Sequence, residues 1–338
     1  SASYDEARTK FLAVSKDAGG QLERVTHPER GPSGGDLSTD VAWFGPRDAE
    51  RVLVMISGTH GVEGYCGSGA QVDWLRRGEQ ANLPAGTSAL LIHAINPYGF
   101  AWDRRVTEDN VDLNRNWIDF TKPPPPNRAY GELADLLCPR DWNAKVQEET
   151  SAALMQWVGS HGMPAFQQAA SGGQYTHPKG IFYGGAGPTW SRRTQTRIFE
   201  TYLKQATKIA LIDYHTGLGP WGFAEQIIPL ARDTEAFKRA AQWYGCAVTS
   251  PVSGGSTSAD VVGDGSSAAV KHLDHAEVTC VALEVGTVPV LAVLQALRAD
   301  AWLHAYGDPL SDAGRAIKKQ IRAAFYGDAD DWKGMVAG

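Results

Sequence analysis

Short apolar runs and amphipathic segments alternate along most of this chain. The apolar or alternating runs predict β-strands at residues 22–28, 39–44, 52–57, 88–95, 208–214 and 277–284. Apolar residues at helical spacing predict helices at residues 4–17, 67–77, 145–171, 192–206, 232–244, 288–305 and 309–325. Because helices separate most of the strands, the pattern predicts an α/β fold with three layers, α/β/α, around a mixed, largely parallel, twisted sheet.

The predicted strands extend over most of the 338 residues without an obvious break. No Gly/Ser-rich or charged linker divides the sequence, and the proline run at 123–126 fits a stiff surface excursion better than a domain boundary. The hydrophobic content of 43% is ample for a large core. We therefore expect a single domain, residues 1–338.

Two potential metal ligands, His60 and Glu63, lie just beyond the strand predicted at 52–57. Open α/β sheets usually carry their active sites at such strand ends. Glycines at positions 58, 61 and 64 allow the backbone to bend sharply and to turn both side chains toward one point. A His and a Glu three residues apart also occur in solvated turns, so the pair needs a third ligand before it indicates a metal site.

His215 has a matching position, because it follows the strand predicted at 208–214 and precedes a glycine-rich turn. Parallel neighbouring strands would bring His60 and His215 to the same edge of the sheet. His-His-Glu is an established ligand set for catalytic zinc, so the sequence predicts one Zn2+ per chain. Asp213, two residues earlier, fits either a partner of a ligand ring or a buried polar residue.

A polar segment at residues 96–117 contains three arginines, Arg104, Arg105 and Arg115, together with Asn114. One interpretation is a solvated, salt-bridged surface loop. The other is an anion and oxyanion site, because guanidinium groups bind carboxylates in a bidentate manner and stabilise developing negative charge.

Glu284 ends the apolar run at 277–284. A carboxylate there is costly if it is buried without a partner. The partner is an arginine in a structural interpretation. In a catalytic interpretation it is an activated water, and Glu284 acts as general base and then as general acid.

Taken together, these residues resemble the carboxypeptidase A-like zinc carboxypeptidases over residues 50 to 290. The shared features, in order, are His60-x-x-Glu63, Asn-Pro-x-Gly-Phe at 96–100, Asn-Arg-Asn at 114–116, His215 and Glu284. The runs Gly-Thr-His-Gly-Val-Glu-Gly and His-Thr-Gly-Leu-Gly-Pro are similar to those of an uncharacterised bacterial branch of that family, which is related to the succinylglutamate desuccinylase/aspartoacylase group.

The resemblance implies a zinc carboxypeptidase-like fold in which His60, Glu63 and His215 are the zinc ligands. It also implies that Glu284 is the general acid/base of a metallocarboxypeptidase-type reaction. The reaction would hydrolyse an amide bond next to a free carboxylate.

The same resemblance implies roles for the polar segment at 96–117. Arg105 matches the arginine that polarises the scissile carbonyl, and Arg104 is a less well-aligned neighbour. Asn114 and Arg115 match the pair that holds the terminal carboxylate of the substrate.

One departure from the family pattern concerns a mobile tyrosine that follows a Ser-Gly-Gly-Ser-like turn. This chain has the turn at 253–256, but the small, glycine-rich stretch at 260–275 contains no tyrosine. Tyr175 or Tyr183, in the glycine-rich segment 172–190, could supply the missing hydroxyl if that segment covers the cleft. The alternative is a packed surface loop with no catalytic part.

Three functions therefore stay open. The first is a zinc metallocarboxypeptidase acting on a small peptide, and the second is an N-acyl amino acid amidohydrolase on the same scaffold. The missing tyrosine favours the second, whereas the intact Asn-Arg-Asn motif and the long middle region favour the first. A non-catalytic zinc-bearing binding protein is the weakest, because binding alone would not require Glu284.

The net charge of -6, without clustered Lys or Arg, argues against a nucleic-acid partner. No segment of the printed sequence has the character of a membrane span or a signal peptide, so we expect a cytoplasmic location and no membrane partner. The four cysteines are widely spaced, as is typical of reduced thiols, with disulfides as the alternative. The oligomeric state is not indicated.

Overall fold

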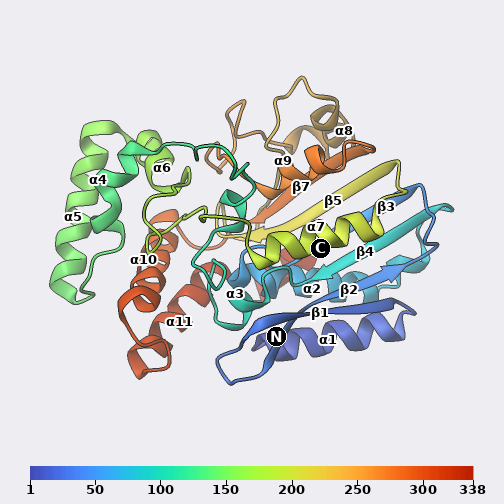
Figure 1. Ribbon diagram of the computed structural model, residues 1–338, viewed down its shortest axis with the longest axis horizontal. Coiled ribbons are helices and arrows are strands. Elements are labelled where there is room, and N and C mark those ends of the chain that lie inside the picture. Colours follow the sequence, from blue (N-terminus) through green and yellow to red (C-terminus); the bar gives the residue numbers. More distant parts are fainter. Residues whose placement is uncertain (338) are drawn as a thin grey trace.

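A computed structural model of the chain describes residues 1–337 and contains a seven-stranded sheet in the order β1-β2-β4-β3-β5-β7-β6 (Figure 1). The strands are β1 (Gln21–Arg30), β2 (Asp36–Phe44), β3 (Arg51–Ile56), β4 (Thr87–His93), β5 (Lys208–Thr216), β6 (Ala224–Ile227) and β7 (Glu277–Val285). The central strands β4, β3, β5 and β7 are parallel, whereas β1, β2 and β6 pair antiparallel at the two edges.

Helices lie on both faces of this sheet and at one end of it. They are α1 (Tyr4–Asp17), α2 (Gly64–Arg76), α3 (Pro97–Ala101), α4 (Arg128–Leu137), α5 (Ala144–His161), α6 (Met163–Ser171), α7 (Trp190–Tyr202), α8 (Glu235–Tyr244), α9 (Gly265–His272), α10 (Val290–Tyr306), α11 (Asp312–Phe325) and α12 (Asp330–Ala337). The predicted three-layer α/β fold with a mixed, largely parallel sheet is confirmed.

The two faces of the sheet are covered by different helices because strand side chains alternate in direction. On one face, Met55 of β3 packs with Phe11 of α1 and Leu75 of α2. On the other face, Val54 packs in a cluster that includes Phe199 of α7 and Ala269 of α9. Both layers are mainly apolar, as expected for parallel strands that are buried on each face.

A second group of helices packs beside the sheet rather than on it, at the left of Figure 1. Its core joins α4, α5 and α6 to α10 and α11, with Tyr130, Leu154, Phe166, Leu297 and Ile321 all buried together. We call this group the helical lobe (α4, α5, α6, α10 and α11). Because α10 follows β7 directly, the lobe lies next to the carboxyl ends of the central strands.

The structure departs from the predicted elements in several places. The helix predicted at 145–171 is two helices, because Gly162 has a φ of 87° and separates α5 from α6. Strand β6 and helices α3, α4, α9 and α12 were not predicted. The helix predicted at 4–17 has these ends in the structure, and the other predicted helices and strands are present with shifted ends.

Two further observations concern membrane-spanning helices and disulfide bonds. Within residues 1–337, no helix combines the length and the apolar character needed to cross a bilayer. The four cysteines are free thiols, of which only Cys246 is exposed.

Candidate metal centre

The turn after β3 directs His60 and Glu63 into the interior. Gly58 has a φ of 69°, a conformation that favours glycine. At Gly61 the backbone passes so close to α3 that an added Cβ would lie 2.0 Å from the carbonyl carbon of Gly99. The chain bends sharply here because no side chain intervenes.

Three potential ligand atoms converge on one point. The Nδ1 atom of His60 lies 3.0 Å from Oε1 of Glu63, and the Nδ1 atom of His215 lies 3.0 Å from Oε2 of the same carboxylate. The two Nδ1 atoms are 3.2 Å apart. Zinc bonds of about 2.0–2.1 Å in tetrahedral geometry place neighbouring donors roughly 3.3–3.4 Å apart, so the spacing fits such an ion.

The outer nitrogen of each histidine faces a carboxylate. His60 Nε2 lies 3.1 Å from Asp112 Oδ1, and His215 Nε2 lies 3.0 Å from Asp213 Oδ2. These partners favour the tautomer that keeps the proton on Nε2 and leaves the Nδ1 lone pair free. Two lone pairs and the Glu63 carboxylate would repel one another without a cation between them. The donor set therefore fits a metal ion.

The charges around this point agree with that interpretation. Burial alone would raise the pKa of Glu63, but the neighbouring His60, His215 and Arg105 hold it well below its usual range. Burial likewise works against the charged form of His215, yet Asp213 and Glu63 raise its pKa well above the ordinary value. The cluster thus keeps Glu63 ionised and favours positive charge at its centre.

The adjacent arginines Arg104 and Arg105 have opposite orientations. Arg105 donates from Nη1 to Glu63 Oε1 and from Nε to Asp112 Oδ2, each over 3.0 Å, and lines the cavity described below. Arg104 is buried away from the metal ligands, where its Nε lies 3.0 Å from Asp300 on α10. Only Arg105 is placed to act on a bound substrate.

Glu284 lies beside His215, its register partner in the parallel pair of β5 and β7. One oxygen, Oε1, accepts a hydrogen bond of 2.8 Å from the backbone N–H of Leu218. Burial and the negative charge of Glu63 raise the pKa of Glu284 to about 7. A carboxyl group with this pKa can both accept and release a proton near neutral pH.

Asn114 and Arg115 also line this cavity, from the short 3-10 turn η3 (Leu113–Arg115). Arg115 is buried, and its guanidinium donates to two backbone carbonyl oxygens, Ser171 O at 3.1 Å and Asn114 O at 2.8 Å. No carboxylate among the residues 1–337 forms an ion pair with it. Burial lowers the pKa of Arg115. Because its guanidinium has no carboxylate partner among these residues, this group is suited to bind an anion.

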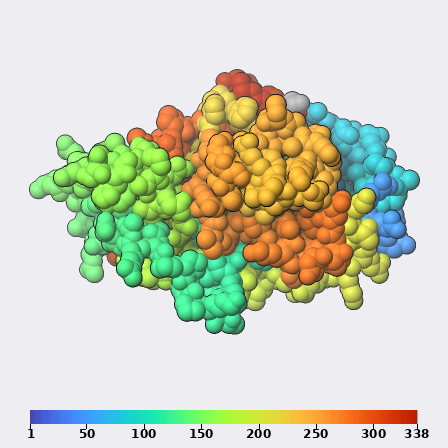
Figure 2. All heavy atoms as spheres, turned by 90° about the horizontal axis from the view of Figure 1, so that it is seen from above, coloured from blue at the N-terminus to red at the C-terminus, as the bar shows by residue number. Residues whose placement is uncertain are grey.

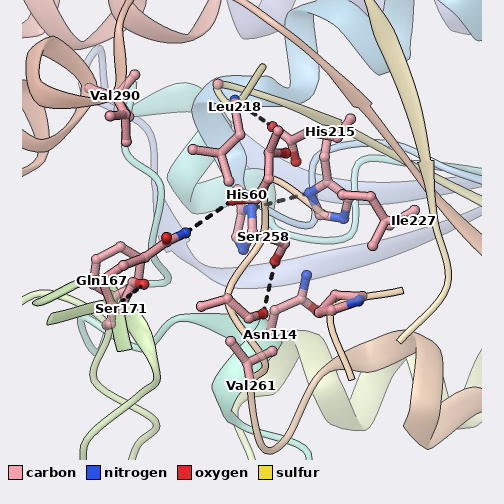
Figure 3. A pocket seen from close by; sticks show the side chains of 18 of the residues that line it. His60, Asn114, Gln167, Ser171, His215, Leu218, Ile227, Ser258, Val261 and Val290 are labelled. Atoms are coloured by element: carbon pink, nitrogen blue, oxygen red, sulfur yellow. Dashed lines mark hydrogen bonds between the residues drawn. The ribbon is translucent and has the colours of Figure 1, made fainter. Parts of the chain in front are cut away.

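One cavity of about 460 Å³ is lined by site residues from several elements: His60, His215, Glu284, Arg105, Asn114 and Arg115 (Figure 3). Its walls come from the strand ends, from the segment between β6 and α9, and from the helical lobe. Figure 2 shows the α4–α6 part of the lobe, in green, beside the segment after β6, in gold to orange. Gln167 of α6 joins them by a hydrogen bond of 3.0 Å to the carbonyl oxygen of Thr257.

The family described as "Protein of unknown function (DUF2817)" matches residues 1–338. The chain belongs to the DUF2817 family. No curated protein matches the sequence significantly.

Solved structures similar to this DUF2817 protein include a carboxypeptidase A. Carboxypeptidase A from Helicoverpa armigera aligns with a TM-score of 0.50 and 12% identity, covering 95% of this chain and 73% of that one. Thrombin activatable fibrinolysis inhibitor aligns with a TM-score of 0.48 and 10% identity over the same shares of the two chains. At such identities the first match establishes a carboxypeptidase A-like fold and no more. The group His60, Glu63 and His215 is typical of the zinc ligand set of that fold.

The DUF2817 structure adds one residue that the sequence analysis did not assign. Asp112 is fully buried and contacts His60, Arg105 and the backbone N–H of Asn114, the last at 2.9 Å. It therefore holds together three residues of the candidate site. In the sequence, only the position of Asp112 between Arg105 and Asn114 points to such a role.

The two tyrosines considered as substitutes for the family tyrosine do not line the cavity. The hydroxyl of Tyr175 donates to the backbone oxygen of Arg115 over 2.6 Å, and Tyr183 is buried behind the same turn. Phe182 faces the cavity between them. In this DUF2817 chain the segment 172–190 thus packs against the turn that carries Asn114 and Arg115 and stabilises it.

Proposed function

We propose that this protein is a zinc-dependent hydrolase that cleaves an amide bond next to a free carboxylate. The observation that carries the proposal is the convergence of His60, Glu63 and His215 on one point, in a cavity that also contains Glu284 and Arg115. A metal-binding group, a carboxyl group with a pKa near neutrality and an unpaired buried cation are the parts that such a reaction needs.

His60, Glu63 and His215 hold the zinc ion in this proposal. A bound zinc ion supplies Lewis acidity, which polarises a carbonyl oxygen and promotes the ionisation of water. Glu284 takes a proton from the attacking water and delivers it to the leaving nitrogen. Its raised pKa allows both transfers near neutral pH.

The two arginines that line the cavity have different roles in this proposal. Arg105 stabilises negative charge that develops on the carbonyl oxygen of the scissile bond. Arg115, with Asn114 beside it, binds the carboxylate of the substrate and so fixes which amide bond is presented. Both a peptide and an N-acyl amino acid carry such a carboxylate, so either class of small molecule fits this part of the site.

Substitution of Arg115 tests the recognition of the carboxylate. The zinc-loaded protein is assayed with blocked dipeptides and N-acyl amino acids, each as the free acid and as the C-terminal amide. Because charged hydrogen bonds contribute about 1.5–3 kcal/mol, we expect Arg115→Ala to raise KM for the free acids by about 10–100-fold. Turnover of the amides, if measurable, changes little.

The matched control is Arg193→Ala. Arg193 is exposed, also donates to a backbone carbonyl oxygen, and lies outside the cavity. An equal effect of both substitutions, or an Arg115→Ala protein that still prefers the free acid to the amide as strongly as the unmodified protein does, would count against the proposed role. Absence of hydrolysis of every amide by the zinc-loaded protein would overturn the proposed function.

A further inference from the structure

One wall of the cavity is made of aliphatic and aromatic side chains from the helical lobe. We call it the apolar wall and define it by the residues of α6 and α10 that line the cavity: Met163, Phe166, Ala170, Val290, Leu291, Val293, Leu294 and Leu297. None of these side chains can donate a hydrogen bond, and only the sulfur of Met163 is a weak acceptor. The chemistry of the proposed reaction does not use any of them.

The polar side chains on the same helices add little to this wall. Gln167 and Ser171 also line the cavity from α6. The amide of Gln167 donates to Thr257 O over 3.0 Å, and the hydroxyl of Ser171 donates to Gln167 O over 2.6 Å. Against the side chains of the apolar wall itself, a peptide would lose hydrogen bonds from its backbone N–H groups to water without regaining them, whereas a hydrocarbon chain loses none.

The apolar wall continues to the surface. Met163, Val290 and Leu291 line the cavity and are nevertheless 41%, 54% and 48% exposed. In Figure 3, Val290 lies at one end of the view and Asn114 near the other, with His60 between them. A substrate whose carboxylate contacts Arg115 therefore has its other end directed along the wall toward solvent.

We propose that the apolar wall binds the hydrocarbon chain of an acyl group, so that the substrates are N-acyl amino acids with medium or long acyl chains. This inference rests on the proposed hydrolase function. Water breaks the amide C–N bond: its oxygen joins the acyl carbon, and a proton joins the nitrogen. The products are a fatty acid and a free amino acid.

Chain length is the direct test of this proposal. The zinc-loaded Glu284→Gln protein is titrated by calorimetry with N-acetyl-, N-octanoyl- and N-dodecanoyl-L-alanine, so that binding is measured without turnover. Because each buried methylene contributes about 0.8 kcal/mol, Kd should fall roughly tenfold for every two methylenes until the chain leaves the cavity. Equal affinity for the three compounds would overturn the proposal.

Substitution of Leu291 tests whether the dependence of affinity on acyl-chain length comes from the apolar wall. Leu291→Asp should weaken binding of the dodecanoyl compound at least tenfold and leave the acetyl compound within about twofold. The control is Leu310→Asp, since Leu310 is 55% exposed and does not line the cavity. Leu291→Ala, with a smaller loss of the same kind, replaces the aspartate variant if that protein fails to fold. Equal effects at positions 291 and 310 would contradict the assignment.

A peptide-binding wall gives a different result. In that case a blocked dipeptide with phenylalanine on the acyl side would bind as tightly as the dodecanoyl compound, which would overturn the proposal in favour of a peptide. Failure of the proposed function gives another result. Affinity would still depend on acyl-chain length, but the protein with Glu284 intact would hydrolyse no amide. The apolar wall would then keep its assignment, and the reaction would be refuted.

Discussion

The wall that carries the metal ligands comes from strand ends, whereas the apolar wall comes from helices α6 and α10 at the other side of the cavity. The strand-end wall is held by directed polar contacts: each histidine has a carboxylate behind it, and Arg105 contacts both Glu63 and Asp112. The side chains of the apolar wall are held only by packing contacts. The comparison separates residues that determine the reaction from residues that determine which substrate reaches it.

Replacement of Glu284 is the strongest test of this division. Glu284→Gln keeps the size of the side chain and removes the proton acceptor, so kcat/KM should fall by about 10²–10⁴-fold with zinc content unchanged. The measurement combines hydrolysis kinetics with metal analysis of the same preparation. Glu277→Gln, an exposed position at the start of the same strand, is the control and should be silent. Undiminished turnover of Glu284→Gln would refute its role.

A substitution of Arg104 probes the boundary between the two walls. Its ion pair with Asp300 is buried and joins the turn after α3 to α10. Arg104→Ala leaves Asp300 with Lys318 as its remaining cationic contact, so the free energy of unfolding should fall by about 3 kcal/mol. Denaturant unfolding measures this loss. Zinc content and KM should stay the same, and a large rise in KM at full stability would place Arg104 in substrate binding instead.

The carboxylates behind the histidines should have a smaller, graded effect. Asp213→Asn weakens the acceptor for His215 Nε2–H, and such partners typically change metal affinity by 10–100-fold. Competition with a zinc-binding dye measures the Kd, with Asp274→Asn, an exposed position, as control. Asp112→Asn should weaken zinc binding to a similar degree. Unchanged affinity in both variants would mean that the histidine orientation does not depend on these contacts.

Much of the strand-end wall could be predicted from the sequence because its signals are local. Each metal ligand lies within a few residues of an apolar run, and parallel pairing then brings the ends of β3 and β5 together without further information. Arg104 and Arg105 show the limit of this reasoning. Both occur in the same polar segment, and only the packing of α10 draws Arg104 to Asp300.

The apolar wall could not be predicted, because it depends on contacts between distant segments. A continuous helix over 145–171 fits the hydrophobic spacing, yet Gly162 ends α5 and gives α6 a new direction toward the cavity. Strand β6 is short and contains Glu225 and Gln226, so it becomes a strand only by pairing with β7. Helix α9 begins with small residues and depends on Asp264, whose side chain accepts from Ser267 N, and on Ala269 packed in the core.

The central claim is that His60, Glu63 and His215 bind one zinc ion. Metal analysis tests it most directly, on the protein after incubation with zinc and removal of the excess, beside His60→Ala and His215→Ala. We predict one zinc ion per chain in the unmodified protein and in Glu284→Gln, and a nearly complete loss in both alanine variants. A folded, unmodified protein that takes up no zinc, or a His215→Ala protein that retains a full equivalent, would contradict the account.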